Sequence, residues 1–174
     1  MGLRPGRTMR DSNKPAWSRY SRSKPKKSYI KAMPHQDITQ FRMGVSKPDY
    51  DIIAKLISKQ NIQIRDNALE SARQALNKYL EKTILGNFYF VIKVFPHQII
   101  RENKMIAGAG ADRLQKGMRQ SFGRATDKAA RVRKNQEIFI IKSYKNKIDV
   151  INNAIKRTLK KLPGEYISII KENA

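Results

Sequence analysis

The residues that could bind a metal or act as acid and base are few in this chain. It contains no cysteine, which excludes disulfides, thiolate zinc sites and cysteine nucleophiles. His35 and His97 each follow a proline and have no partner at ligand spacing. Asp49 and Asp51 form a D-x-D pair that a strand would place on one face, as in some divalent metal sites. No third ligand is near them, so turn residues before a strand are the favoured interpretation. We expect no catalytic residue, no metal and no cofactor.

A glycine-rich basic stretch is the other candidate for chemistry. The string GAGADR at 108–113 begins like a dinucleotide-binding fingerprint, but Arg113 stands where the third glycine should be, and no strand directly precedes the string. From Arg101 to Arg124 there are six cations and four glycines against Glu102 and Asp112. Glycine lets a backbone approach a partner closely and also permits flexibility. Two interpretations therefore remain open, a binding loop and a merely flexible loop.

The charge balance of the chain points to a polyanionic partner. The 174 residues carry 37 Lys plus Arg against 14 Asp plus Glu, a formal net charge of +23. Hydrophobic residues make up 40%, so a core can form but must be spread thinly. The longest apolar stretch, 88–95, is interrupted by Lys93 and is too short to span a bilayer. Together with the absence of an apolar leader, this predicts a cytosolic protein without membrane contact.

The elements that must position these residues follow from the hydrophobic periodicity. A helix is expected from Asp66 or Asn67, with Glu70 in a capping-box position, to a stop at Gly86. A second helix is expected over 146–162. Strands are predicted at 38–43, 50–57, 62–64, 87–95, 128–133, 137–144 and 165–171. The 50–57 segment would also suit a short buried helix, and the 128–133 and 137–144 strands read as a hairpin around residues 134–135.

These elements predict an α+β fold, a two-layer sandwich of largely antiparallel sheet with two main helices. Residues 38–174 form a single domain in this interpretation. Residues 1–37 are strongly basic, with Trp17, Tyr20 and Tyr29 interleaved, and are expected to form an extended N-terminal arm that orders only on a partner.

The second helix carries the densest cation cluster of the domain. Lys156, Arg157, Lys160 and Lys161 fall one turn apart with no interleaved acid, which is costly unless a polyanion lies against them. A solvated helix face is the alternative. Cations are spread over arm, loop and helices, whereas a groove-reading module concentrates them on one element. A domain enclosed by structured RNA, as in a ribosome, is therefore favoured.

Specific strings support this interpretation. They are AMPH at 32–35, DNALESAR at 66–73 with KYLEK at 78–82, VFPH at 94–97, and RENKM at 101–105 running into GAGADRLQKGMR at 108–119. Over nearly its whole length the chain resembles the archaeal and eukaryotic large-subunit ribosomal protein ten-e family, which includes the QM protein and whose bacterial counterpart is large-subunit protein sixteen. An archaeal source is expected because the chain ends soon after its last predicted strand.

The resemblance implies a seat on large-subunit rRNA near the A-site tRNA and the peptidyl transferase centre, with a role in tRNA positioning and subunit maturation. The implied partners are large-subunit rRNA, with 5S rRNA as a further candidate, A-site and P-site tRNA, and neighbouring large-subunit proteins. The implied loop at 101–118 would face tRNA and the catalytic centre through Arg101, Lys104, Met105, Gly108, Gly110, Arg113 and Lys116. The rRNA-binding residues would be Arg4, Arg7, Arg10, Lys14, Trp17, Arg19, Tyr20, Arg22, Lys24, Lys26, Lys27, His35, Arg119, Arg124, Lys156, Arg157, Lys160 and Lys161.

The arm departs from the family pattern, and two other function classes remain as alternatives. Family members commonly carry cysteines in the arm, where this chain has Thr8, Ser12, Ser18 and Ser21. A free RNA-binding or regulatory factor would have to remain compact without a ribosome, which the unbalanced arm charge disfavours. A metal-dependent nucleic-acid-processing enzyme would need an acidic cluster that the sequence lacks.

Overall fold

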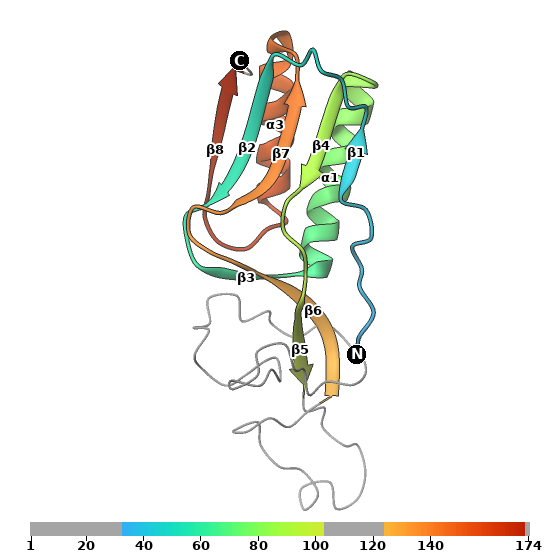
Figure 1. The fold of residues 1–174 in the computed structure, drawn as a ribbon, viewed down its shortest axis with the longest axis vertical. Coiled ribbons are helices and arrows are strands. Elements are labelled where there is room, and N and C mark those ends of the chain that lie inside the picture. Colours follow the sequence, from blue (N-terminus) through green and yellow to red (C-terminus); the bar gives the residue numbers. More distant parts are fainter. Residues whose placement is uncertain (1–32, 103–123, 173–174) are drawn as a thin grey trace, which may run out of the picture.

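The computed structural model describes residues 33–102 and 124–172. Most of the predicted arm and most of the predicted loop lie outside these ranges. Five strands form one sheet in which every neighbouring pair is antiparallel, in the order β1-β4-β7-β2-β8 (Figure 1). They are β1 (Arg42–Gly44), β2 (Ile52–Ser58), β4 (Phe88–Ile92), β7 (Glu137–Ser143) and β8 (Tyr166–Glu172).

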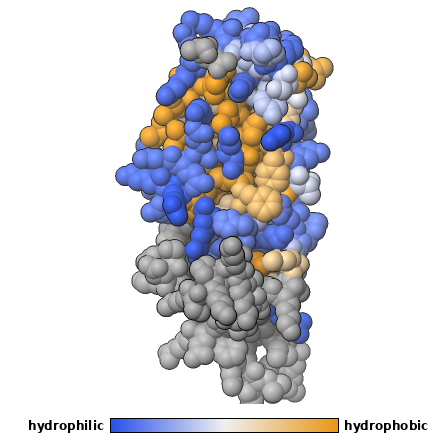
Figure 2. Space-filling model, viewed as in Figure 1, coloured by the Kyte–Doolittle hydropathy of each residue, from blue (hydrophilic) through white to orange (hydrophobic). Residues whose placement is uncertain are grey.

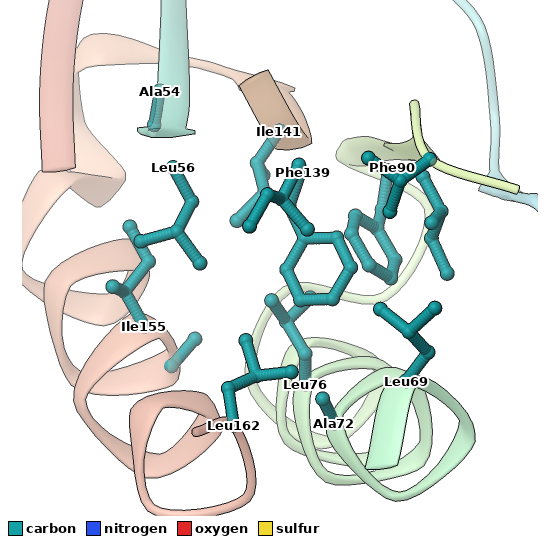
Figure 3. Close-up of a cluster of buried hydrophobic side chains, with 14 of the residues drawn as sticks. Ala54, Leu56, Leu69, Ala72, Leu76, Phe90, Phe139, Ile141, Ile155 and Leu162 are labelled. Carbon is teal, nitrogen blue, oxygen red and sulfur yellow. The ribbon is translucent and has the colours of Figure 1, made fainter. Parts of the chain in front are cut away.

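Two helices cover one face of this sheet and pack against each other (Figure 1). They are α1 (Asp66–Ile84) and α3 (Ile148–Leu159), the latter preceded by the 3-10 turn η1 (Lys145–Lys147). In Figure 3, Leu69 and Leu76 of α1 point toward Phe90 and Phe139 of the sheet, and Ile155 of α3 points toward Leu56 of β2; all of these side chains are buried. The two phenylalanine rings meet edge to face, with centroids 5.3 Å apart. This arrangement confirms the predicted α+β fold with two main helices.

A second, three-stranded antiparallel sheet extends from one end of the first. Its order is β3-β6-β5, with β3 (Ile62–Arg65), β5 (Gln98–Glu102) and β6 (Arg124–Val132). The chain passes between the sheets four times, from β2 to β3, from β3 through α1 to β4, from β4 to β5 and from β6 to β7. The β2–β3 and β6–β7 passages run side by side, because the backbone N–H of Asn135 donates to the carbonyl of Ser58 (2.8 Å) and that of Ser58 donates to the carbonyl of Gln136 (3.1 Å).

The predicted hairpin of β6 and β7 is wrong. The turn exists, with Asn135 at a φ of 65°, but β6 pairs with β3 and β5 whereas β7 pairs with β2 and β4. Local alternation identified both strands and the turn between them. It could not reveal that the chain changes sheets there, because strand pairing is a tertiary property.

Other predicted elements are confirmed or corrected one by one. The 50–57 segment is strand β2 and not a helix, and the expected helix over 66–86 and last strand are present. Of the strand predicted at 38–43, only Arg42 and Met43 lie in a strand, β1. Strand β5 was not predicted. The capping box is absent, since Arg65 is the N-cap residue without a side-chain cap bond. Glu70 instead accepts hydrogen bonds from the side chains of Arg73 and Gln74.

The face of the five-stranded sheet that points away from the helices mixes apolar and basic side chains. Along β2, Ile53, Lys55 and Ile57 alternate with buried residues, and Ile140 and Lys142 do the same along β7. Figure 2 shows hydrophobic side chains gathered on this face with hydrophilic ones around them. The strand predicted over 87–95 is β4, in which Phe88, Phe90 and Ile92 are buried while Tyr89 and Val91 between them are partly exposed. Within 33–102 and 124–172, no helix is long and apolar enough to cross a membrane.

Candidate nucleic-acid interface

Three segments far apart in the sequence meet where the two sheets join. They are 58–61 between β2 and β3, 133–136 between β6 and β7, and 160–165 between α3 and β8 (Figure 1). The backbone N–H of Lys59 donates to the carbonyl of Glu165 (3.0 Å), and that of Lys134 donates to Oδ1 of Asn61 (2.8 Å). We call this meeting point the basic corner.

The basic corner concentrates positive charge at the surface. Lys59, Arg133, Lys134, Lys160 and Lys161 are all exposed. The acid within the three segments is Glu165, whose carboxylate lies 4.0 Å from Nζ of Lys59 with both side chains largely in water. An ion pair that is this exposed contributes little to stability, because water screens the attraction between its charges. Five like charges brought together on one surface make a site for a polyanion.

The sequence singled out only two of these five cations. Lys160 and Lys161 were predicted from their spacing. Lys59, Arg133 and Lys134 lie between strands and show no local periodicity. They join the cluster because the β2–β3 and β6–β7 passages run side by side. Covariation of these turns with the end of the second helix could have revealed this, but a single sequence could not.

The last turn of α3 extends the corner along the helix layer. Lys156 and Arg157 are exposed there, and a cation at a helix C-terminus is favoured by the helix dipole. Cζ of Arg157 lies 4.3 Å from the ring centroid of Tyr79 on α1. The helix was predicted to run to residue 162 but ends at Leu159. Lys160 and Lys161 therefore lie in the turn that follows α3.

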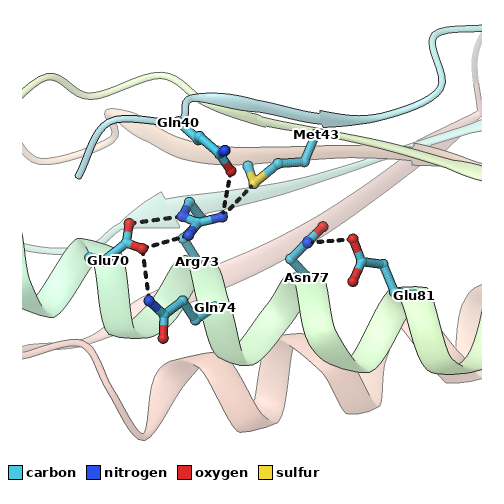
Figure 4. Close-up of polar contacts among 7 residues, drawn as sticks. All are labelled: Gln40, Met43, Glu70, Arg73, Gln74, Asn77 and Glu81. Carbon is cyan, nitrogen blue, oxygen red and sulfur yellow. Dashed lines mark hydrogen bonds and ion pairs between the residues drawn. The ribbon is translucent and has the colours of Figure 1, made fainter. Parts of the chain in front are cut away.

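An ion pair on α1 holds the segment before β1 against the helix. Nε of Arg73 donates to Glu70 (2.8 Å), and one terminal nitrogen of Arg73 approaches Oε1 of Gln40 (3.2 Å) and the sulfur of Met43 (3.3 Å), as Figure 4 shows. The Arg73 and Glu70 side chains are 13% and 17% exposed. The hydrogen bonds from Arg73 lower the pKa of Glu70 below its ordinary value.

The point where the N-terminal arm joins the domain is fixed by Asp66. Its two carboxylate oxygens accept the backbone N–H groups of Asp37 (3.1 Å) and Asn67 (2.9 Å). Burial of Asp66 raises its pKa despite these bonds.

The residues just before this point also contact the domain. Nζ of Lys128 in β6 donates to Oε1 of Gln36 (3.3 Å). His35 is exposed, with Nε2 3.9 Å from the Asp37 carboxylate. Gln36 and Asp37, predicted as part of the arm, thus contact β6 and α1 respectively.

Two predicted site residues lie at the base of the glycine-rich stretch. Arg101 was predicted as the first loop residue, but it is the fourth residue of strand β5 and is 8% exposed. The prediction of Arg101 as a loop residue is corrected because Gln98–Glu102 pairs with β6 as a strand, which the sequence QIIRE does not mark by any alternation. Arg124 begins β6 and is exposed. Glu102 of β5 lies opposite Arg124 in the ladder.

The remaining predicted site residues lie outside the described residues. In the arm these are Arg4, Arg7, Arg10, Lys14, Trp17, Arg19, Tyr20, Arg22, Lys24, Lys26 and Lys27. In the loop they are Lys104, Met105, Gly108, Gly110, Arg113, Lys116 and Arg119.

Asp49 and Asp51, the D-x-D pair, accept hydrogen bonds from the residues that follow β7. Oδ2 of Asp49 accepts the hydroxyl of Tyr144 (2.8 Å), and Oδ2 of Asp51 accepts the backbone N–H of Lys145 (3.3 Å). The bond from Tyr144 lowers the pKa of Asp49. Both acids thus hold the chain that follows β7, in agreement with their interpretation as turn residues.

Comparison with known proteins agrees with the basic surface. Residues 17–169 match the family described as Ribosomal protein L16p/L10e. The protein named large ribosomal subunit protein uL16 of Methanococcus aeolicus is 42% identical over 176 residues, which cover 100% of this chain and 97% of that protein. The protein of the same name from Thermofilum pendens is 43% identical over 164 residues, or 94% of each chain. With a family match over most of its length and archaeal relatives of nearly the same extent, this chain belongs to the L16p/L10e family and is a structural protein of the large ribosomal subunit, in the cytoplasm.

Proposed function

We propose that this chain binds large-subunit rRNA through the basic corner and the last turn of α3. The supporting observation is that three separate segments bring Lys59, Arg133, Lys134, Lys160 and Lys161 together against one weakly paired acid. In a free protein these charges repel one another, whereas RNA phosphates neutralise them and release counterions. Arg157, held over Tyr79, presents its guanidinium beside them.

Salt dependence tests this surface. A variant with Lys156, Arg157, Lys160 and Lys161 all replaced by Gln should bind large-subunit rRNA with a flatter dependence of log affinity on log salt. The slope falls by about three if each cation meets one phosphate. The matched control replaces Lys142, Lys145, Lys147 and Lys171 by Gln, at the end of the five-stranded sheet remote from the corner. Equal slopes for the two variants would mean that the charge acts only through the net charge of the molecule.

We further propose that the chain lies near the A-site tRNA and the peptidyl transferase centre and supports tRNA positioning and subunit maturation. Membership in the L16p/L10e family and the string at 101–119 support this proposal. The loop cations Lys104, Arg113 and Lys116 would meet tRNA and rRNA phosphates. Large-subunit rRNA, 5S rRNA, A-site and P-site tRNA and neighbouring large-subunit proteins are the proposed partners.

Replacing Lys104, Arg113 and Lys116 by Gln tests the role of the loop. The variant should melt like the wild type and enter large subunits, while those particles should be slower in tRNA accommodation and peptide-bond formation. The control is a variant with Lys142, Lys145 and Lys147 replaced by Gln, which removes the same charge at the end of the five-stranded sheet remote from the basic corner. Particles of normal activity would refute the role in tRNA positioning, and failure of incorporation would shift the role to assembly.

A further inference from the structure

The segment that follows β4 presents alternate side chains to solvent. Lys93, Phe95 and His97 are exposed, whereas Val94 and Pro96 between them are buried. Alternation of this kind places the three exposed side chains on one side of an extended chain, about 7 Å from one to the next. A cation, an aromatic ring and an imidazole thus line the same strip of surface.

The Phe95 ring is held in place although it is 54% exposed. Its centroid lies 5.4 Å from that of Phe41, with the ring planes inclined at 31°. The backbone beneath is fixed on both sides. The N–H of Ile92 donates to the carbonyl of Phe41 (2.9 Å), and that of Lys93 donates to the carbonyl of Ile138 (2.8 Å). The Phe41 ring and the hydrogen-bonded backbone therefore hold the Phe95 ring in one orientation, with a face open to solvent.

His97 closes the strip. Its Nδ1 lies 3.0 Å from the carbonyl oxygen of Phe95, and because a carbonyl can only accept, Nδ1–H is the donor. This bond orients the imidazole and leaves Nε2 for another partner. The His97 imidazole, like the Phe95 ring, is thereby held in a fixed position.

We propose that Phe95, backed by Phe41 and flanked by Lys93 and His97, is a stacking platform for an unpaired base of large-subunit rRNA. The inference rests on the proposed rRNA binding. Unpaired bases stack on aromatic side chains, and a neighbouring cation meets the adjoining phosphate. The flanking residues decide between possible occupants. Lys93 and the exposed Arg42, which lies opposite Val91 in the β1–β4 ladder, give the strip positive charge, and residues 91–97 contain no acid. An apolar protein segment alone would leave that charge unmatched.

The test compares ring-preserving with ring-removing variants of the full chain, using a transcript of large-subunit rRNA as the probe. Phe95→Leu keeps an apolar side chain but removes the π face, and should weaken binding roughly five- to 150-fold, the equivalent of ~1–3 kcal/mol per stacked base. Phe95→Trp should bind at least as well as the wild type. The salt slope should not change in either variant, because no phosphate contact is lost. Photo-crosslinking of the wild type should attach a nucleotide to the peptide that contains Phe95.

Leu85→Ser is the matched control, since Leu85 is 78% exposed at the far end of α1 and should have no effect on binding. Equal affinity of Phe95→Leu and wild type overturns the inference while leaving the proposed rRNA binding intact. An effect of Phe95→Leu confined to particles that contain other ribosomal proteins overturns it as well, because the platform would then contact protein. If the wild type itself fails to bind the transcript, the proposed function is wrong.

Discussion

The guanidinium of Arg157 lies over the ring of Tyr79, with Cζ 4.3 Å from the ring centroid, and joins the last turn of α3 to the middle of α1. A cation over an aromatic face is attracted by the ring quadrupole. This contact has two effects. It ties the two helices together at their outer surface, and it limits the freedom of an arginine at the edge of the basic corner, so that less entropy is lost when the guanidinium meets a phosphate.

Tyr79→Leu should therefore weaken rRNA binding by more than Tyr79→Phe. Leu keeps the packing but removes the ring, whereas Phe keeps the ring and loses only the hydroxyl. The cation–π contact is worth ~0.5–1 kcal/mol at such a site, so the expected loss of affinity is about two- to fivefold. Binding of both variants to large-subunit rRNA at one salt concentration measures this. Equal affinities would show that the contact acts only between the helices.

Glu70→Gln should remove part of the acid sensitivity of the fold. Arg73 lowers the pKa of Glu70 in the folded protein, so the pair stabilises the fold above the ordinary value of 4.5 and is lost as the pH falls through the lowered pKa. The wild type should exceed the variant in unfolding free energy by about 1–3 kcal/mol at neutral pH, and by less below pH 4. Urea unfolding of both proteins at several pH values provides the measurement. A constant difference would contradict the assigned cause.

Asp66→Asn should show the opposite pH dependence. Burial raises the pKa of Asp66, so its contribution to stability is fully present below the ordinary value of 3.8 and decreases as the pH rises through the folded pKa. The advantage of the wild type over the variant should thus be larger in acid than at pH 7. Both variants change a residue of α1 near its start, which makes them controls for each other. Parallel slopes for Glu70→Gln and Asp66→Asn would refute both assignments.

Gly44→Ala should destabilise the edge of the five-stranded sheet strongly. Gly44 has a φ of 81°, and a Cβ there would lie 2.3 Å from the carbonyl oxygen of Phe88. Gly86 has a similar φ of 76° but no atom within 4 Å of an added Cβ. Gly86→Ala should cost about 1 kcal/mol from the backbone alone, and Gly44→Ala clearly more because β1 must shift. Thermal melting of the two variants separates the steric from the conformational cost, and equal losses would contradict the close approach.

The sequence alone determined the class of fold and the chemistry of the partner. Three- and four-residue spacing of Leu69, Ala72, Leu76 and Leu80 indicates a helix with one buried face, and the alternation of residues 62–64 indicates a strand, because each pattern aligns apolar groups in one backbone geometry. The 50–57 segment suited a strand or a short buried helix, and only the structure decided for strand β2. The excess of Lys and Arg is a property of composition and holds whatever the fold. The strings around 66–82 and 94–119 indicated the family.

The tertiary structure decided which distant residues share a surface. Lys59 and Lys134 join Lys160 only because the β2–β3 and β6–β7 passages run side by side. That arrangement depends on the pairing of β2 with β7 and of β3 with β6, strands far apart in the sequence, which local periodicity does not encode. The burial of Arg101 in β5 was missed for a related reason. An apolar or basic residue on a strand has the same local pattern whether or not another layer covers its face, so only the arrangement of the layers determines whether it is core or surface.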